Sequence, residues 1–381
     1  MAARNGSVPA ETGNKLARMV THAVEKDNGR RSHRRALTLG LVAVLVLVLA
    51  VAGALMPVPY VSLRPGPTMN TIGTNPETKK PLIEIEGART YAASGHLNFT
   101  TVAYTGGPKR PLSLFTALRD WIDDERAVVP QETIFPKNET VEEVEQQNTL
   151  QMEDSQQTSV AAALVQTGRK PSTVPAVQSA EKGLPADGVL KPGDEILAVG
   201  GTKTDRTTAV TGELKKYKPG QTVELTIRRD GKEQKVSLTT APAPDDANRA
   251  VIGVVLGDRY VFPIDVNISV GDIGGPSAGL MFSLGIYDLL TPGDLTGGKF
   301  IAGTGTITVD GKVGAIGGIQ QKMIGAKEAG ATVFLVPAGN CDEAAAAAPD
   351  GLRLVKAETL DGTVKALQAL QSGQGTVPSC S

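Results

Sequence analysis

One serine follows a Gly-Pro turn in a setting that suits a nucleophile. The segment GGPSAG, residues 274–279, places Ser277 directly before a run of small and apolar residues. Glycine lets the backbone approach a ligand closely, and proline fixes its own φ. Free backbone N–H groups at the start of a helix could then stabilise an oxyanion. A serine at this position can instead cap the helix, so the motif alone leaves both readings open.

One lysine is a candidate for the base that such a serine needs. Lys322 lies on an expected helix that starts near Ile319, and its helical neighbours are apolar or small. Burial would lower the pKa of its ammonium, and a neutral amine can remove a proton from a hydroxyl. The alternative is a side chain that reaches water with its charged end. Lys327 has similarly apolar neighbours, so this pattern does not choose between the two lysines, although a cation near a helix C-terminus is favourable for structural reasons.

Other chemistry has little support in the chain. Of the three histidines, only His96 lies beyond the N-terminal apolar segment, and nothing near it recommends a Ser-His-Asp triad. Cys341 and Cys380 lack metal-ligand spacing, but in an oxidising compartment they could form a disulfide. Residues 293–300 superficially match a phosphate loop, yet Phe300 stands where a Mg²⁺-binding hydroxyl is needed. We therefore expect no metal, no nucleotide and no cofactor.

Together the serine and lysine segments resemble the proteolytic domain of the Lon family. The match consists of GPSAG and the pattern G-K-V-x-x-I-G-G-x-x-x-K, which ends at Lys322. The resemblance implies that Ser277 is the nucleophile and Lys322 the catalytic lysine. Residues 302–307 resemble the strand before the lysine loop, which implies that Thr304 orients the lysine. The supporting turn and oxyanion backbone would come from three neighbours of the serine: Gly275, Pro276 and Ala278.

The chain departs from the Lon pattern in two respects. Lon carries an acidic residue three positions before the serine, where this sequence has Gly274, with Asp272 two positions further back. Lon also carries an ATPase module, and none is recognised here. The resemblance therefore predicts proteolysis that needs no ATP.

An uncharged apolar run, residues 36–56, is long enough to cross a bilayer. Its 21 residues form a helix that can span a hydrocarbon core of about 30 Å. Pro57 and Pro59 end it, and four arginines within residues 30–35 precede it. Basic flanks stay in the cytoplasm, so residues 1–35 should be cytoplasmic and everything from residue 57 onward extracytoplasmic. The alternative is a cleaved signal peptide with a processing site near residues 50–52, which would also export the rest.

Three extracytoplasmic segments follow. Residues 57–165 show strand patterns at 82–86 and 97–104 and helix patterns at 112–126 and 140–165, and they could form part of the catalytic fold. Residues 166–242 contain LKPGDEILAVGG, a short helix at 207–217 and a hairpin around Asp230-Gly231. This segment resembles a PDZ domain of bacterial proteases, which binds extended peptide at a sheet edge. Its carboxylate-binding loop should precede Val174 but is not recognisable, and a simple spacer is the alternative.

Residues 250–371 alternate strands with helices and form the Lon-like domain, followed by a tail, residues 372–381. Strands are expected at 252–255, 266–270, 299–308, 332–336 and 352–355, and helices at 277–290, at 319–329 and through Leu370. A Pro-rich linker, residues 241–246, joins this part to the PDZ-like segment. The fold class is therefore α/β (α+β), with a PDZ-like β module and one transmembrane helix.

Composition and arrangement narrow the function. The chain has 381 residues, a net charge of −1 and 4% aromatic residues, which favours two or three folded units and no nucleic-acid partner. The arrangement resembles the bacterial membrane-anchored PDZ–Lon-like serine proteases, which implies a membrane partner through residues 36–56, polypeptide substrates and, because Lon-type domains often form rings, a homo-oligomer. Two alternatives stay open: a PDZ scaffold on an inactive protease domain, and a signal-peptidase-like processing enzyme.

Overall fold

The computed structural model describes residue 35, residues 37–76 and residues 78–380. These residues divide into two compact units. The first contains the described residues up to Ser62 together with Thr105–Pro136, and the second contains Leu63–Tyr104 and Lys137 onward. Two of the three histidines and most of the arginine cluster expected before the membrane segment lie outside the described residues: His22, His33, Arg30, Arg31 and Arg34.

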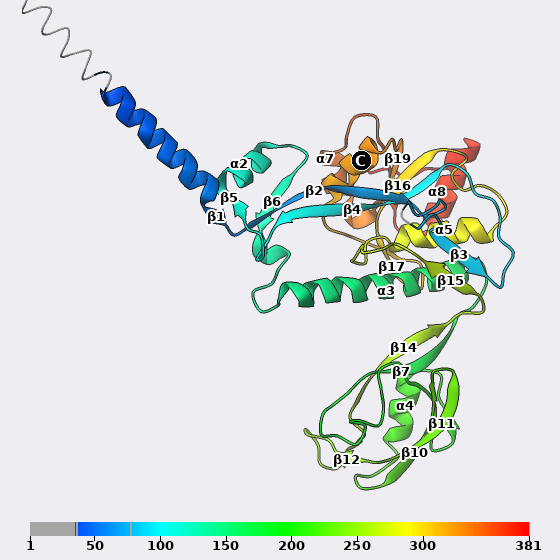
Figure 1. Cartoon of the computed structure of the whole chain (residues 1–381). Coiled ribbons are helices and arrows are strands. Elements are labelled where there is room, and N and C mark those ends of the chain that lie inside the picture. The colour runs from blue at the N-terminus through cyan, green and yellow to red at the C-terminus, as the bar shows by residue number, and fades with distance from the viewer. Residues whose placement is uncertain (1–34, 36, 77, 381) are drawn as a thin grey trace, which may run out of the picture. The chain divides into compact units, whose positions relative to one another are not determined.

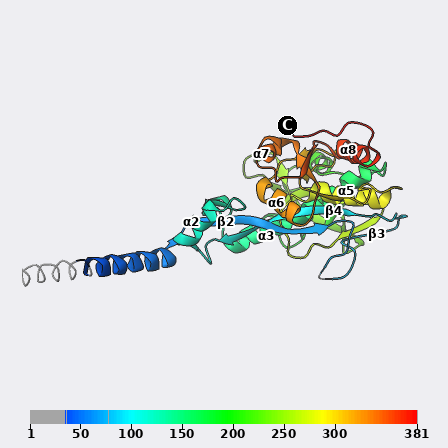
Figure 2. The same ribbon diagram turned by 90° about the horizontal axis from the view of Figure 1, so that it is seen from above.

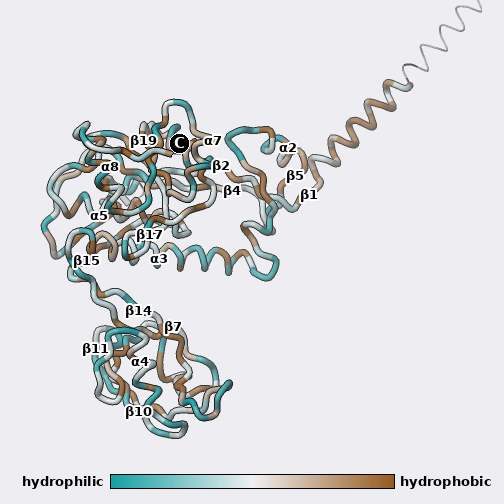
Figure 3. The backbone as a smooth tube through the Cα atoms, turned by 180° about the vertical axis from the view of Figure 1, so that it is seen from behind, coloured by the Kyte–Doolittle hydropathy of each residue, from teal (hydrophilic) through white to brown (hydrophobic). Residues whose placement is uncertain are grey.

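The first unit begins with an apolar helix, Leu37–Leu55, whose mean hydropathy reaches 2.8. Its large apolar side chains are exposed, and Figure 3 shows it as hydrophobic along its length. Such a helix is long and apolar enough to cross a membrane, and a signal sequence would meet the same criterion.

The chain leaves this helix through a short strand pair. β1 (Pro57–Val58) pairs antiparallel with β5 (Leu112–Ser113). α2 (Leu114–Ile122) follows at once, and the Ser113 side chain accepts a hydrogen bond from Thr116 N–H as its N-cap. The remaining elements of the unit are β6 (Ala127–Pro130) and the 3₁₀ turn Gln131–Thr133. α2 is shorter than the expected helix at 112–126. Residues 112 and 113 form β5 instead, and Asp123 has an extended backbone that ends the helix.

A central sheet positions the C-terminal motifs. Its order is β20-β19-β16-β4-β2-β6, and β2 and β4 lie side by side in Figure 1. β16 pairs in parallel with both β4 and β19, and β19 pairs in parallel with β20. Strands from before and after the PDZ-like segment therefore share one sheet. The bounds are β2 (Tyr60–Asn70), β4 (His96–Gly106), β16 (Phe300–Gly303), β19 (Val333–Pro337) and β20 (Arg353–Ala357).

A second pairing also joins the two parts of the sequence. β3 (Ile83–Glu86) pairs antiparallel with β15 (Asp265–Ile268), although about 180 residues separate them. We therefore propose that residues 63–104 belong to the catalytic fold and that the PDZ-like segment is inserted into it.

Helices cover this sheet and bury the largest core cluster. α3 (Val141–Gln166) starts with a capping box in which Thr140 and Glu143 satisfy each other's backbone N–H groups. It packs against α5 (Gly279–Leu290), whose Leu280, Phe282 and Leu284 are fully buried. The remaining elements are the short strands β17 (Thr306–Ile307) and β18 (Val313–Gly314) and the helices α6 (Ile319–Glu328), α7 (Cys341–Ala346) and α8 (Leu360–Ser372).

The PDZ-like segment forms its own sheet, in the order β11-β10-β8-β7-β14. The turn between β10 and β11 has Asp230 at φ 51° and Gly231 at φ 75°, as an Asp-Gly hairpin requires. The bounds are β7 (Ser172–Ala180), β8 (Glu195–Val199), β9 (Thr202–Lys203), α4 (Thr207–Leu214), β10 (Thr222–Arg229), β11 (Lys232–Thr239) and β14 (Val254–Val261).

This part of the structure differs from the expectation in two places. Residues 241–246 are not only a linker, because β12 (Ala241–Pro242) pairs with β13 (Ala250–Val251). The strand expected at 252–255 is longer, and it extends the PDZ-like sheet through its pairing with β7, which runs from Val254 opposite Ala180 to Val261 opposite Ser172. We propose that β14 belongs to the PDZ-like module rather than to the start of the Lon-like domain.

The C-terminal tail is held in place. Cys341 and Cys380 form a disulfide, and Lys356 N–H donates to Pro378 O at 2.9 Å. The chain accordingly ends beside α7 in Figures 1 and 2.

Candidate active site

Ser277 lies in the turn that leads into α5, and its side chain does not cap the helix. The N-cap residue is Ala278, and α5 begins two residues after the serine rather than at it. The Ser277 Oγ instead lies 2.7 Å from the Lys322 Nζ. The capping alternative that the sequence left open is therefore not the conformation adopted.

α3 holds this turn from the other side. Gly275 N–H donates to Asn148 O at 2.8 Å, and Ser155 Oγ donates to Pro276 O at 3.0 Å. One helical turn further on, Ser159 Oγ donates to Gly279 O at 3.0 Å. Sequence reasoning missed this support. The available signal was a pair of small hydroxyl side chains at i and i+4, on a face of α3 that is otherwise apolar.

Close packing explains the glycines around the serine. A Cβ at Gly274 would lie 2.9 Å from the Asn148 Cβ, and a Cβ at Gly279 would lie 2.9 Å from the Ile307 Cγ2. Gly275 has φ +88°, which glycine adopts without strain. The turn therefore approaches both α3 and β17 more closely than other residues would allow.

Lys322 is the buried lysine of α6. Its exposed fraction is 3%, whereas Lys327 on the same helix is exposed. In the described part of the chain, no carboxylate pairs with Lys322. Burial alone lowers the pKa of its ammonium from 10.5 to about 7. The structure thus separates two lysines that the local sequence pattern did not.

Thr304 connects the two groups. It follows β16, is fully buried, and donates its hydroxyl hydrogen to Ser277 O at 2.9 Å. Since that hydrogen is engaged, the Thr304 Oγ1 accepts from the Lys322 Nζ, 2.9 Å away. Gly305 N–H also donates to Ser277 O, at 2.8 Å. Three segments that are separate in the sequence therefore meet at one point.

The residues around Ser277 differ in whether their backbone N–H group is free to bind an oxyanion. Pro276 has no N–H, and the Gly275 N–H is taken by Asn148 O. Among the hydrogen bonds within the described residues, none uses the N–H of Ser277 or Ala278. These two groups are available to a ligand beside the serine, whereas Gly275 and Pro276 shape the turn.

Other candidates lie apart from this cluster. His96 begins β4 and stacks on the Phe300 ring with centroids 4.3 Å apart. Asp272 is exposed in a turn. The phosphate-loop lookalike is a loop that leads into β16, where Asp294 accepts from the backbone N–H groups of Thr296 and Gly297. Within the ranges that the structure describes, no group of three His, Cys, Asp or Glu side chains could hold a metal ion.

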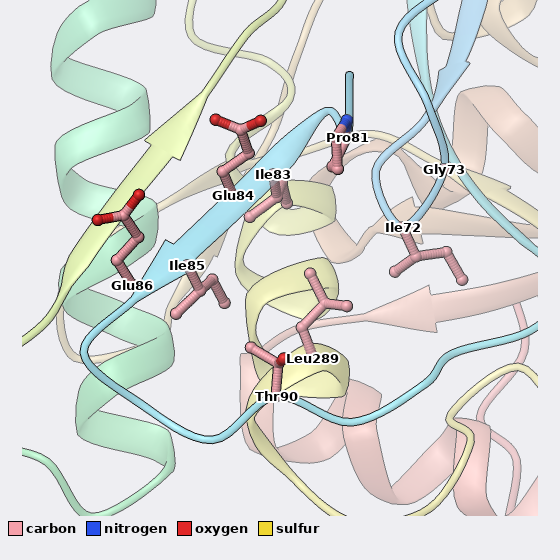
Figure 4. A pocket seen from close by; sticks show the side chains of 9 residues that line it. All are labelled: Ile72, Gly73, Pro81, Ile83, Glu84, Ile85, Glu86, Thr90 and Leu289. Atoms are coloured by element: carbon pink, nitrogen blue, oxygen red, sulfur yellow. The ribbon is translucent and has the colours of Figure 1, made fainter. Parts of the chain in front are cut away.

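A pocket of about 450 Å³ lies elsewhere, between β3 and the C-terminal end of α5. Figure 4 shows Ile83 and Ile85 pointing toward α5 while Glu84 and Glu86 point away from it. The lining includes Thr90 and Leu289 but none of the three clustered residues. Because the short contact between a hydroxyl and a buried amine lies outside this pocket, the serine–lysine cluster is the candidate site.

Two family models match the chain. Residues 149–240 match the PDZ domain, and residues 263–369 match the Lon protease (S16) C-terminal proteolytic domain. The second range contains Ser277, Thr304 and Lys322.

Curated Lon proteases also match part of the chain. The Lon protease of Campylobacter concisus is 31% identical over 140 residues, which are 36% of this chain and 17% of that protein. Lon protease 2 of Herpetosiphon aurantiacus is 40% identical over 81 residues, 20% of this chain and 10% of that protein. The Lon protease of Clostridioides difficile is 40% identical over 76 residues, which are 19% of this chain and 9% of that protein. The chain thus spans less than a fifth of the length of these relatives.

Solved structures of PDZ domains match part of the chain. The PDZ domain of an SdrC-like protein from Listeria monocytogenes is 21% identical, covers 22% of this chain and 86% of that one, and has a TM-score of 0.20. The PDZ domain of the SdrC-like protein from Listeria innocua is also 21% identical. It covers 22% of this chain and 92% of that one, with a TM-score of 0.20. On the family models and the curated relatives, this α/β chain carries a Lon-type (S16) proteolytic domain together with a PDZ domain.

Proposed function

We propose that this chain is a serine endopeptidase that works without ATP, with Ser277 as nucleophile and Lys322 as general base. The observation that carries the proposal is the 2.7 Å separation of Ser277 Oγ and Lys322 Nζ. Burial lowers the pKa of that lysine to about 7, so a large fraction is neutral at neutral pH. A neutral amine this close can accept the hydroxyl proton as the serine attacks.

The hydrogen bonds around the lysine favour this direction of proton transfer. The hydrogen of Thr304 Oγ1 is directed at Ser277 O, so one Nζ–H of the lysine is directed at the threonine oxygen. In the neutral amine, the lone pair can then take the direction of Ser277 Oγ, to which the ammonium donates. Ser277 attacks the scissile carbonyl, Lys322 takes its proton and passes it to the leaving amine, and the N–H groups of Ser277 and Ala278 stabilise the oxyanion. Water activated by the neutral lysine hydrolyses the acyl-enzyme.

The same proposal places the enzyme on a membrane. Leu37–Leu55 would span the bilayer, and the arginines before it would keep the N-terminus in the cytoplasm. Exported or membrane proteins are then the accessible substrates. The Cys341–Cys380 disulfide is consistent with an oxidising compartment.

The PDZ-like module offers an edge for extended polypeptide. β14 is the last strand of its sheet and pairs only with β7 among the described strands. A peptide that adds to this edge gains main-chain hydrogen bonds, which are independent of its sequence. β14 also leads, through β15, to the Ser277 turn, so we propose that the module holds substrate for the catalytic site.

Cleavage of unfolded casein in the absence of ATP tests the proposal. The full chain in detergent should cleave it, while Ser277→Ala and Lys322→Ala should lose turnover. The exposed lysine of the same helix supplies the matched control, since Lys327→Ala should keep wild-type activity. Cleavage by either site variant at the wild-type rate contradicts the assignment.

A serine-reactive phosphonate probe separates the proposal from its rival, a PDZ scaffold on an inactive protease domain. Labelling that depends on both Ser277 and Lys322 indicates an activated nucleophile even when casein is a poor substrate. No labelling of the folded wild-type chain supports the scaffold.

A further inference from the structure

α2 has its polar and apolar faces reversed relative to an ordinary surface helix. Its buried residues are Ala117 and Asp120. Its exposed residues include Phe115, Leu118, Trp121 and Ile122, with exposed fractions of 46%, 44%, 72% and 75%. A helix on a soluble protein turns such side chains toward the core. Here four large apolar side chains share an exposed patch, which marks a contact surface for something outside the unit.

The buried aspartate is held by local charges. Arg119 donates to the Asp120 Oδ1 at 2.8 Å, and Arg126 donates to the Oδ2 at 3.3 Å. Arg119 lies on α2 itself, but Arg126 lies beyond its C-terminal end, so turning the helix over would break the Arg126–Asp120 ion pair while hiding the apolar face. The orientation with the apolar face outward is therefore fixed by interactions within the first unit.

The position of this face identifies its partner. α2 begins where the apolar helix Leu37–Leu55 ends, because Leu114 N–H donates to Met56 O at 3.0 Å. The Phe115 ring packs against Gly53, so closely that a Cβ on that glycine would lie 2.7 Å from the ring. The patch on α2 thus continues the apolar surface of the candidate membrane helix, without intervening polar structure.

We propose that α2 lies in the lipid interface, with Phe115, Leu118, Trp121 and Ile122 inserted below the headgroups. This inference depends on the proposed membrane span. Interfacial helices insert their apolar face about 5–10 Å, and tryptophan prefers that depth. Three carboxylates follow the helix directly: Asp123, Asp124 and Glu125. Binding should therefore come from apolar burial and not from attraction to anionic lipid.

The single tryptophan of the chain makes the proposal measurable, because all tryptophan emission comes from Trp121. The full chain is reconstituted in phosphatidylcholine vesicles, which contain no other protein. We expect blue-shifted emission, poor quenching by acrylamide, and strong quenching by lipids brominated near the glycerol end of the acyl chain. Replacing part of the phosphatidylcholine with phosphatidylglycerol should change little.

Two variants provide the contrast. Leu118→Ser with Ile122→Ser keeps the reporter and should shift its emission toward that of exposed tryptophan, with acrylamide quenching restored. Asp124→Ser on the same segment should leave the emission unchanged. Red emission of the wild type, with quenching by acrylamide but not by bromolipid, overturns the proposal. Blue emission that bromolipid does not quench indicates a protein partner and also overturns it.

Three readouts keep this inference separate from the proposed function. Intact mass and resistance to alkaline extraction report whether Leu37–Leu55 is retained and embedded. Casein cleavage reports the active site and should be the same in the double variant. If the chain is embedded and active but Trp121 stays in water, only the interfacial position of α2 is contradicted. If the chain is cleaved after the apolar helix, the membrane anchor itself is contradicted.

Discussion

Lys322 owes its properties to burial and not to a charged neighbour. An ion pair would stabilise its ammonium and raise its pKa, whereas burial disfavours the charge and lowers it. Its partners are instead two hydroxyl oxygens, Ser277 Oγ and Thr304 Oγ1. A neutral hydroxyl can accept from the ammonium or donate to the free amine, so the lysine nitrogen keeps a hydrogen-bond partner in both protonation states.

The pH dependence of cleavage should report this lysine. If the neutral amine is the reactive form, as proposed, its pKa of about 7 means that kcat/KM should rise with pH and level off above about 7. Below that value it should fall about tenfold per pH unit. Measuring kcat/KM on a fluorogenic peptide from pH 5.5 to 8.5 checks this. A profile that is flat, or that falls as pH rises through this range, contradicts a neutral lysine base.

Thr304 should act by positioning the lysine. Thr304→Val keeps the volume but removes the donor to Ser277 O and the acceptor for Lys322 Nζ. We expect kcat to fall on the order of 100-fold with KM nearly unchanged. The apparent pKa of the rate should also fall, since the ammonium loses an acceptor.

The conservative variant distinguishes positioning from mere packing. Thr304→Ser restores the hydroxyl and should recover most of kcat and the original pH profile. Equal losses in the valine and serine variants would show that the methyl group, and not the hydroxyl, matters.

At the scale of elements, α3 supports the turn that carries Ser277. Three of its residues contact the turn, through one backbone carbonyl and two serine hydroxyls: Asn148, Ser155 and Ser159. α5 begins against β17, since Leu280 N–H donates to Gly305 O at 3.0 Å. The serine is therefore positioned by elements on both sides of it.

Gly279→Ala tests how tightly this turn is packed. The added Cβ would lie 2.9 Å from the Ile307 Cγ2 and 3.1 Å from both the Ile307 N and the Ser155 Oγ. We expect a loss of about 1–3 kcal/mol in the free energy of unfolding and a clear drop in kcat. Urea unfolding and peptide cleavage measure the two effects.

A glycine in open space provides the comparison. Gly212 in α4 has nothing within 4 Å of an added Cβ, so Gly212→Ala should stabilise by about 0.4–1 kcal/mol and leave kcat unchanged. If Gly279→Ala behaved like Gly212→Ala, the turn that carries Ser277 would not be tightly packed against α3 and β17.

Local patterns predicted many of these elements. The Asp230-Gly231 hairpin, β8 and α6 follow from turn residues and periodicity within a few positions. The extent of β14 could not be predicted in this way, because its partner β7 lies about 80 residues earlier. Pairing between distant segments depends on the whole fold, so the local sequence near residue 254 cannot predict it.

The candidate site, too, could be predicted from the sequence only in part. The resemblance to Lon singled out Ser277, Thr304 and Lys322, which the structure brings within hydrogen-bond distance of one another. The choice between Lys322 and Lys327 depended on which face of α6 is buried, and the packing of the domain decides that. The contribution of α3 likewise comes from a helix more than 100 residues before the serine.

At the scale of the whole molecule, one disulfide secures the C-terminal end of the Lon-like domain. Cys341 and Cys380 are 39 residues apart, and closing a loop of that length in the unfolded chain stabilises by about 3–4 kcal/mol. Cys380→Ser should therefore lower the free energy of unfolding by roughly that amount.

Reductant gives the matching control for this prediction. Dithiothreitol should lower the urea midpoint of the oxidised wild type and leave that of Cys380→Ser unchanged. Cys341→Ser should resemble Cys380→Ser, and the double variant should add little, because either single change already removes the bond. A wild type that is insensitive to reductant would mean that the bond does not stabilise the domain.

The register of β7 and β14 has a consequence for how this architecture can be built and altered. Val261 pairs with Ser172, so the chain enters and leaves the PDZ-like module at adjacent positions, with Cα atoms about 5 Å apart. A bridge of one or two glycines between residues 171 and 262 could therefore replace the module without straining what remains. If the module holds substrate as proposed, a gene could therefore gain, lose or exchange it in one event, which would change the substrates without changing the Lon-like domain.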